Sequence, residues 1–239
     1  MNTLATNAAR SKQYLFSIAL ILAGALFAIR GNTQQLQRGV SVVMASTSSA
    51  TPMPEADNAD AWIVAVTRDG SLFFGVDRVT PESLGDKMKS TPRRRDQKLY
   101  IKADARAPFA DVRQVLTAAH DTTNEASFNG AVLLTSQAES AAVGTVVLPK
   151  GLEVQIAPHS NAATIVVQVN AGPSPTFEVN DQKVPASALQ ETLSRLLQNQ
   201  RDTPVLVKTH GPVLFAPVAQ AIDACHSVGA KVMLSTPQI

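Results

Sequence analysis

The same order of apolar and polar residues occurs twice within the last three quarters of the chain. The first copy, at 61–74, has two short apolar runs separated by Asp69-Gly70, and the second copy repeats the pattern at 163–179. Asp-Gly between two β-rich runs is typical of a hairpin, because a type I′ turn needs positive φ at its central residues. Each copy is therefore predicted to begin with a β-hairpin.

A helix is predicted after each hairpin. In the first copy Thr80 can cap the helix and Pro81 suits its first position, while Leu84 and Met88 share one face. In the second copy leucines recur at helical spacing over 189–197. Both hairpins are thus followed by an amphipathic helix.

Each copy then continues with a strand, a helix and a last strand. Three residue pairs at matching places are separated by a constant 106 positions: Lys102 and Lys208, Phe109 and Phe215, His120 and His226. A constant separation across three residue types indicates an internal duplication. The predicted fold is α/β (α+β), with two tandem ββαβαβ units whose last strand–helix–strand piece crosses over right-handed.

The predicted organisation places these units behind an unusual N-terminal region. The parts are an N-terminal tail with a transmembrane helix at 1–30, a flexible linker at 31–60, the first unit at 61–142, a connection or extra strands at 143–162, and the second unit at 163–239. The linker is assigned from its Gln, Ser, Thr, Ala and Pro content. Each unit alone has a thin core, so we expect the two to pack together.

The uncharged run at 14–29 is the candidate membrane span. Its residues would reach roughly 24 Å as a helix, and the flanking Lys12 and Arg30 can snorkel to the interface. Arg10 and Lys12 precede the run, which favours a cytoplasmic N-terminus and a translocated body. The alternative is a signal peptide cleaved after the small residues at 23–25, leaving a secreted or periplasmic soluble binding module.

Composition excludes several other classes of protein. Among 239 residues, Lys plus Arg is 21 and Asp plus Glu is 19, so a dense basic face for nucleic acid is not expected. A single cysteine, Cys225, argues against a disulfide scaffold or a multi-thiolate metal site, and it lies on an apolar helical face. The histidines form no metal-binding pair, and no nucleophile or phosphate-loop motif occurs. We therefore expect no catalytic, cofactor or metal site and no enzyme.

One dense basic run, Arg93-Arg94-Arg95, has two interpretations. It is either a solvated loop between a helix and a strand or a contact for an anionic envelope surface or partner. Three arginines can pair with carboxylates or phosphates in a bidentate manner.

The first unit resembles the ExbD/TolR family of biopolymer-transport proteins. The similarity includes the hairpin with Asp69 and Gly70, the helix start at 79–81, and the strand ending at Asp104 that is followed by Phe109. In the second unit Phe215 is kept, whereas the equivalent of Asp104 is a histidine. The resemblance covers both units and, by position, the N-terminal anchor.

This resemblance implies a single-pass protein of the cell inner membrane with a periplasmic body. Family members work with an ExbB/TolQ-like multi-span membrane protein as a proton-driven stator, and their folded part acts on peptidoglycan or an outer-membrane-linked protein. The family's anchor carries a proton-carrying aspartate, but Ser17 and Tyr14 are the polar side chains of the run at 14–29. A serine hydroxyl does not exchange protons near neutral pH, so an accessory role is expected. Because family ectodomains pair between chains, the two units are expected to form an intrachain pseudo-dimer.

Overall fold

The computed structural model describes residues 40–91, 98–122, 130–136, 148–157, 165–198 and 203–235. Residues Gln37–Ile239 form one compact unit. The expected transmembrane helix at 14–29 lies outside the described residues. Among the helices that are described, none combines the length and the apolar character needed to cross a bilayer.

The first repeat carries a sheet and two helices. Its elements are β2 (Trp62–Val66), β3 (Leu72–Phe74), β4 (Asp77–Val79), α2 (Pro81–Ser90), β5 (Leu99–Ala103), α3 (Phe109–Thr122) and β6 (Gly130–Thr135). Two short elements precede it, namely β1 (Thr51–Pro52) and the 3₁₀ turn η1 (Pro54–Asp57).

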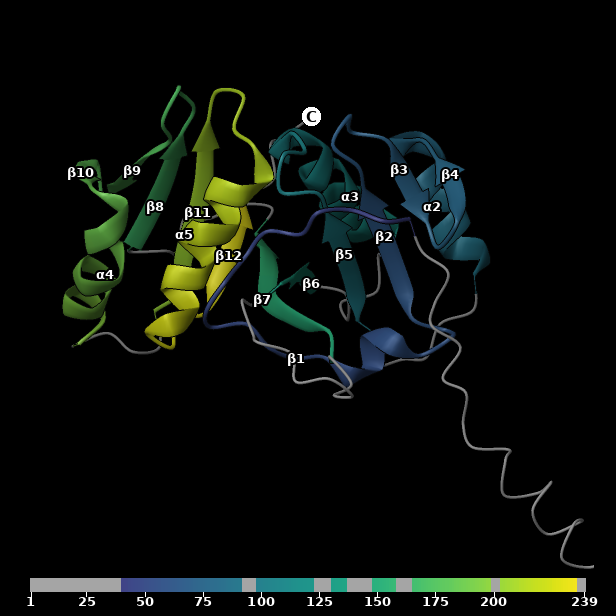
Figure 1. The fold of residues 1–239 in the computed structure, drawn as a ribbon, viewed down its shortest axis with the longest axis horizontal. Coiled ribbons are helices and arrows are strands. Elements are labelled where there is room, and N and C mark those ends of the chain that lie inside the picture. Colours follow the sequence, from purple (N-terminus) through teal and green to yellow (C-terminus); the bar gives the residue numbers. More distant parts are fainter. Residues whose placement is uncertain are drawn as a thin grey trace, which may run out of the picture. The chain divides into compact units, whose positions relative to one another are not determined.

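The second repeat follows one connecting strand, β7 (Lys150–Ala157). Its elements are β8 (Ile165–Asn170), β9 (Thr176–Val179), β10 (Gln182–Val184), η2 (Ala186–Ala188), α4 (Leu189–Leu197), β11 (Val205–His210), α5 (Phe215–Ser227) and β12 (Val232–Ser235). Figure 1 shows the first repeat in blue and teal and the second in green and yellow.

Both repeats have the same strand order, so the predicted duplication has a structural counterpart. The sheet runs β10-β9-β8-β11-β12-β7-β6-β5-β2-β3-β4, and β1 pairs with β7. Lys102 lies opposite Ala65 and Lys208 lies opposite Gln168 at matching places. Each repeat has one more strand than predicted, β4 or β10, because a two-residue turn folds the chain back onto the hairpin.

Strand β7 joins the two repeats into one sheet. It runs antiparallel to β6 and parallel to β12. Of the two interpretations left open for this segment, the structure gives a strand in the interior of the sheet. A Cβ at Gly151 would lie 2.3 Å from Cγ1 of Val132, so glycine is what allows β7 to approach β6 this closely.

The main core lies between the sheet and α2, α3, α4 and α5, which all contribute to one apolar cluster of the described residues. Leu84, Met88, Leu189 and Leu193 are fully buried in it, as the helical spacing predicts. Thr80 caps α2 through a reciprocal pair of hydrogen bonds with Ser83, which confirms the predicted helix start.

A smaller cluster covers the opposite face of the first repeat. Met53 and Ala56, from the segment before β2, pack there with Tyr100, Val132 and Leu134. Residues 40–60 therefore lie against the sheet, where the composition had suggested a flexible linker. The buried methionine and alanine residues hold this segment in place.

The predicted type I′ turn at Asp69-Gly70 is wrong in its geometry. Gly70 alone in this turn has a positive φ, of 80°, and its N–H donates to the Thr67 carbonyl oxygen (2.9 Å). This is a three-residue loop that closes on a left-handed glycine. The turn with two positive φ angles occurs instead between β9 and β10, at Asn180 and Asp181.

The two repeats also meet at the N-terminal turns of α3 and α5. The N–H of Phe109 donates to the Val213 carbonyl oxygen, and the N–H of Phe215 donates to the Ala107 carbonyl oxygen, both at 2.8 Å. The two bonds exchange under the 106-residue shift, as in a two-fold symmetric interface. The expected intrachain pairing is thus present in the described chain.

Phe215→Ala should lower the free energy of unfolding by about 3–5 kcal/mol, because this fully buried ring fills the core beside the contact between repeats. Chemical denaturation followed by circular dichroism measures this, and both proteins should unfold in one transition. Leu196→Ala, at a side chain that is 39% exposed, is the control and should change stability by less than about 1 kcal/mol. Two separate transitions in the unmutated protein would contradict the pairing of the repeats.

Candidate functional site

The sequence-predicted residues fall in three places. Arg93, Arg94 and Arg95 lie outside the described residues. Asp69 and Gly70 lie in the β2–β3 turn, whereas Asp104, Phe109 and Phe215 lie where the two repeats meet. The structure therefore brings three of the five family-matching positions to one region.

The turn at Asp69-Gly70 packs on the first turn of α3. Hydroxyls of Thr67 and Ser71 donate to the Asp69 carboxylate and lower its pKa. A Cβ at Gly70 would lie 2.3 Å from Oδ2 of Asp111, the end of a side chain that can shift, so the φ of 80° is what favours glycine here. Burial raises the pKa of Asp111. These contacts fix the turn and explain both family-matching residues structurally.

Asp104 is a buried carboxylate at the end of β5. It accepts hydrogen bonds from Nε (2.9 Å), Nη2 (3.0 Å) and the backbone N–H (3.0 Å) of Arg106. Its Oδ2 also accepts from the backbone N–H of Val43 (3.1 Å). The Arg106 side chain, together with these N–H groups, holds the pKa of Asp104 well below its usual range.

Val43 begins a segment, residues 43–50, that we call the strap. The Ala105 N–H donates to the Val43 carbonyl oxygen (2.7 Å), and Ser136 both donates to Ala45 and accepts from Thr47 (2.9 Å each). The hydroxyls of Thr47 and Thr135 lie 2.7 Å apart. The strap is thereby hydrogen-bonded to the ends of β5 and β6 in the first repeat.

The strap then reaches the second repeat. The Asp223 carboxylate on α5 accepts from the backbone N–H groups of Ser48 (2.9 Å) and Ser49 (2.8 Å) and from both serine hydroxyls. The Ser49 hydroxyl also lies 2.7 Å from the Asp223 carbonyl oxygen. In Figure 1 the purple segment crosses between the repeats before it returns to β1.

The equivalent place in the second repeat is different. His210 stands where the first repeat has Asp104, and its side chain is exposed. A histidine there supplies no carboxylate for a backbone N–H. The strap therefore binds the first repeat at a place for which the second repeat offers no matching carboxylate.

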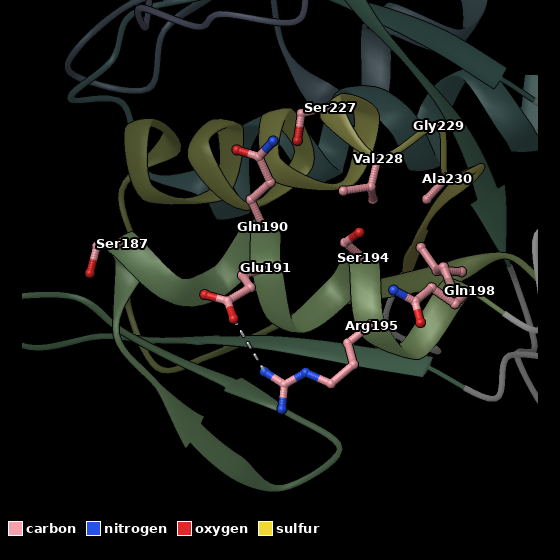
Figure 2. Close-up of a pocket in the computed structure, with 11 residues that line it drawn as sticks. Ser187, Gln190, Glu191, Ser194, Arg195, Gln198, Ser227, Val228, Gly229 and Ala230 are labelled. Atoms are coloured by element: carbon pink, nitrogen blue, oxygen red, sulfur yellow. Dashed lines mark ion pairs between the residues drawn. The ribbon is translucent and has the colours of Figure 1, made fainter.

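A polar groove of about 830 Å³ lies in the second repeat, between α4 and the turn after α5. Gln190 and Ser194 on α4 and Gln198 directly after it line the groove together with residues 227–230 (Figure 2). Glu191 and Arg195 form an exposed ion pair at 4.0 Å beside it. Neutral amides and hydroxyls of this kind can hydrogen-bond to peptide or saccharide groups.

Two further residues have structural roles. Nε2 of His226 donates to the Glu153 carbonyl oxygen of β7 at 2.7 Å, which ties α5 to the connecting strand. Burial raises the pKa of Cys225 to about 12, so its thiol is protonated at neutral pH. Within the described ranges, no group of three or more His, Cys, Asp or Glu side chains is placed to hold a metal ion.

Sequence reasoning missed the contacts of the strap. Ser48 and Ser49 belong to a run whose composition is typical of a linker, and Asp223 is separated from them by about 175 positions. One available signal was the charge of Asp223 next to Ile222 and Cys225, both of which point into the core. A charged residue at the edge of a buried helical face, as Asp223 is, lies close enough to a neighbouring segment to bind its polar groups.

A family model described as "Biopolymer transport protein ExbD/TolR" matches the chain twice, at residues 25–128 and 131–237. The two matches confirm the tandem duplication inferred from the 106-residue shift. No curated protein and no solved structure matches the chain.

Asp104→Asn should lower the free energy of unfolding by about 1–2 kcal/mol at pH 7, because it weakens charged hydrogen bonds to Arg106 and Val43. Since the pKa of Asp104 is lower in the folded chain than in the unfolded chain, this contribution is complete above about pH 5 and declines below about pH 4. Denaturant titrations of both proteins from pH 3 to 8 measure the difference. Asp77→Asn, which removes an exposed pair with Lys87, is the matched control and should have little effect. An equal effect of the two substitutions would contradict the role of Asp104.

Proposed function

Because the chain belongs to the ExbD/TolR family of biopolymer-transport proteins, we propose that it is an accessory, single-pass inner-membrane component of a proton-driven transport or stator complex. Members of this family are transport components and not enzymes. In the proposed arrangement the N-terminus is cytoplasmic and both repeats lie in the periplasm. The partner is an ExbB/TolQ-like multi-span membrane protein.

The extent of the family match is the observation that carries this proposal. The first match begins at residue 25, inside the uncharged apolar run at 14–29, and continues through the first repeat. An apolar run of this length is at the short limit of a bilayer span. Arg10 and Lys12 on its N-terminal side favour a cytoplasmic N-terminus. The match supports the family role, whereas the membrane arrangement is supported by the apolar run and its flanking charges, since the match includes only residues 25–29 of that run.

The accessory role follows from the chemistry of the apolar run. It contains no Asp, Glu, His or Lys, and Ser17 is its internal polar side chain. Proton transport requires a group that binds and releases a proton near neutral pH, which a serine hydroxyl does not do. The proposed protein therefore tethers or transmits force, and another subunit carries the proton.

The groove on α4 is the proposed contact with peptidoglycan. Its lining includes the uncharged hydrogen-bonding side chains of Gln190 and Ser194 together with the exposed Glu191–Arg195 ion pair. Glycan hydroxyls and acetamido groups, like peptide bonds, both donate and accept hydrogen bonds. Amide and hydroxyl side chains match this requirement.

The protein should fractionate with membranes and keep Met1 at its N-terminus. A variant lacking residues 1–36 should be lost from the membrane fraction. Purification in mild detergent should yield a multi-span membrane protein in stable association. N-terminal sequencing checks the alternative, because a mature chain beginning near Leu26 would indicate a cleaved leader. Such a start, or the absence of any multi-span partner, would contradict the proposed complex.

The purified protein should pellet with isolated peptidoglycan, and Gln190→Ala combined with Ser194→Ala should weaken this binding about tenfold or more. Each lost hydrogen bond contributes about 1 kcal/mol. Gln155→Ala, at an exposed position on β7, is the matched control. Binding that is unchanged in the double variant would exclude this groove as the contact.

A further inference from the structure

The buried polar side chains of the described chain are concentrated at the strap. Those with less than a tenth of their surface exposed are Thr47, Asp104 and Thr135, and each makes a strap contact. Every one of these groups can be hydrated if the strap leaves. A polar interface of this kind costs less to separate from its partner than an apolar one of equal area.

Apolar burial holds the strap weakly. Its buried apolar side chains are Ala45 and Ala50, which are small, whereas Val43 is 62% exposed. Met44 is only partly buried, against the second apolar cluster, whereas Met53 and Ala56 of the next segment are buried within that cluster. Opening of the strap would therefore stop near Met53 and leave the sheet intact.

Asp223 is the contact that joins the strap to the second repeat. Its carboxylate accepts from two consecutive backbone N–H groups and two hydroxyls, all supplied by Ser48 and Ser49. Burial raises the pKa of Asp223, but the hydrogen bonds from Ser49 and Ser48 lower it to below its ordinary value. The carboxylate is thus charged at neutral pH, where its hydrogen bonds are strongest.

We propose that the strap, residues 43–50, acts as a clasp: it detaches from both repeats in one cooperative step, while the sheet that the repeats share stays folded. Asp223 on α5 and Asp104 at the end of β5 are its two fastening points. The clasp is the segment through which the N-terminal region reaches both repeats. Resting on the proposed function, this means that tension on the membrane anchor would open the clasp before it unfolds a repeat.

Hydrogen–deuterium exchange of the full-length protein in mild detergent tests the clasp. In Asp223→Asn the amides of Val43 and Thr47, which donate to Asp104 and Ser136, should exchange about tenfold faster. This corresponds to about 1.4 kcal/mol. These amides do not touch Asp223, so their acceleration reports opening of the whole strap. Amides of β5 and β11 should exchange at the unmutated rate.

Asp181→Asn is the matched control, because Asp181 lies in the β9–β10 turn at a φ of 64° that asparagine also adopts. Acceleration confined to Ser48 and Ser49 would overturn the proposal, since the strap would then not open as a unit. Equal acceleration across the sheet would also overturn it, as would no change at all. If Asp223→Asn does not fold, Ser48→Ala combined with Ser49→Ala gives the same test.

This experiment does not depend on where the protein resides. A cleaved leader would remove the membrane anchor and the source of tension, yet the exchange pattern of the strap would stand. Loss of cooperative strap exchange would remove the clasp and leave the membrane role untouched. The two proposals can therefore fail separately.

Discussion

Two exchanged hydrogen bonds between the N-terminal turns of α3 and α5 constrain how the two repeats pair. The first N–H groups of a helix have no partner within that helix. Here Phe109 and Phe215 each donate to a carbonyl oxygen of the other repeat. The N-termini of α3 and α5 each carry a partial positive charge, and these charges repel each other. The carbonyl oxygens that accept the exchanged hydrogen bonds offset this repulsion. A repeat without its twin would lose these acceptors.

The pairing is nearly two-fold, and two segments break the symmetry. β7 lies between β6 and β12, so the two repeats share one sheet and need no direct pairing between their last strands. The strap binds at Asp104, for which the second repeat has His210. The two repeats can differ at this position because a different segment precedes each of them: the strap precedes the first repeat and β7 precedes the second.

A paired domain within one chain changes the stoichiometry of the proposed complex. A family whose folded parts pair between chains needs two anchors for each pair. In the proposed arrangement one apolar run at 14–29 serves two repeats, and the strap connects that run to both of them. The run holds no side chain that titrates near neutral pH, which fits a chain that contributes binding and mechanical linkage.

Local patterns in the sequence were sufficient for the repeat, the order of the elements that were predicted and the faces of the helices. Thr80 and Pro81 start α2, and Leu84 and Met88 enter the core, because capping and helical period act over a few residues. The turn at Asp69 could not be predicted in detail, since the pairing register of β2 and β3 decides the loop length. The added strands β4 and β10 likewise depend on a sheet edge that only the folded hairpin provides.

The sequence by itself determined that one small α/β unit occurs twice behind an uncharged apolar run. Only the tertiary structure decided that β7 lies inside the sheet and that residues 43–50 fasten both repeats. Ser48 and Ser49 have the composition of a linker because their order comes from Asp223, a carboxylate brought to them by the fold. A hydrogen bond across about 175 positions leaves no periodic signal in the chain, whereas burial of one helical face does.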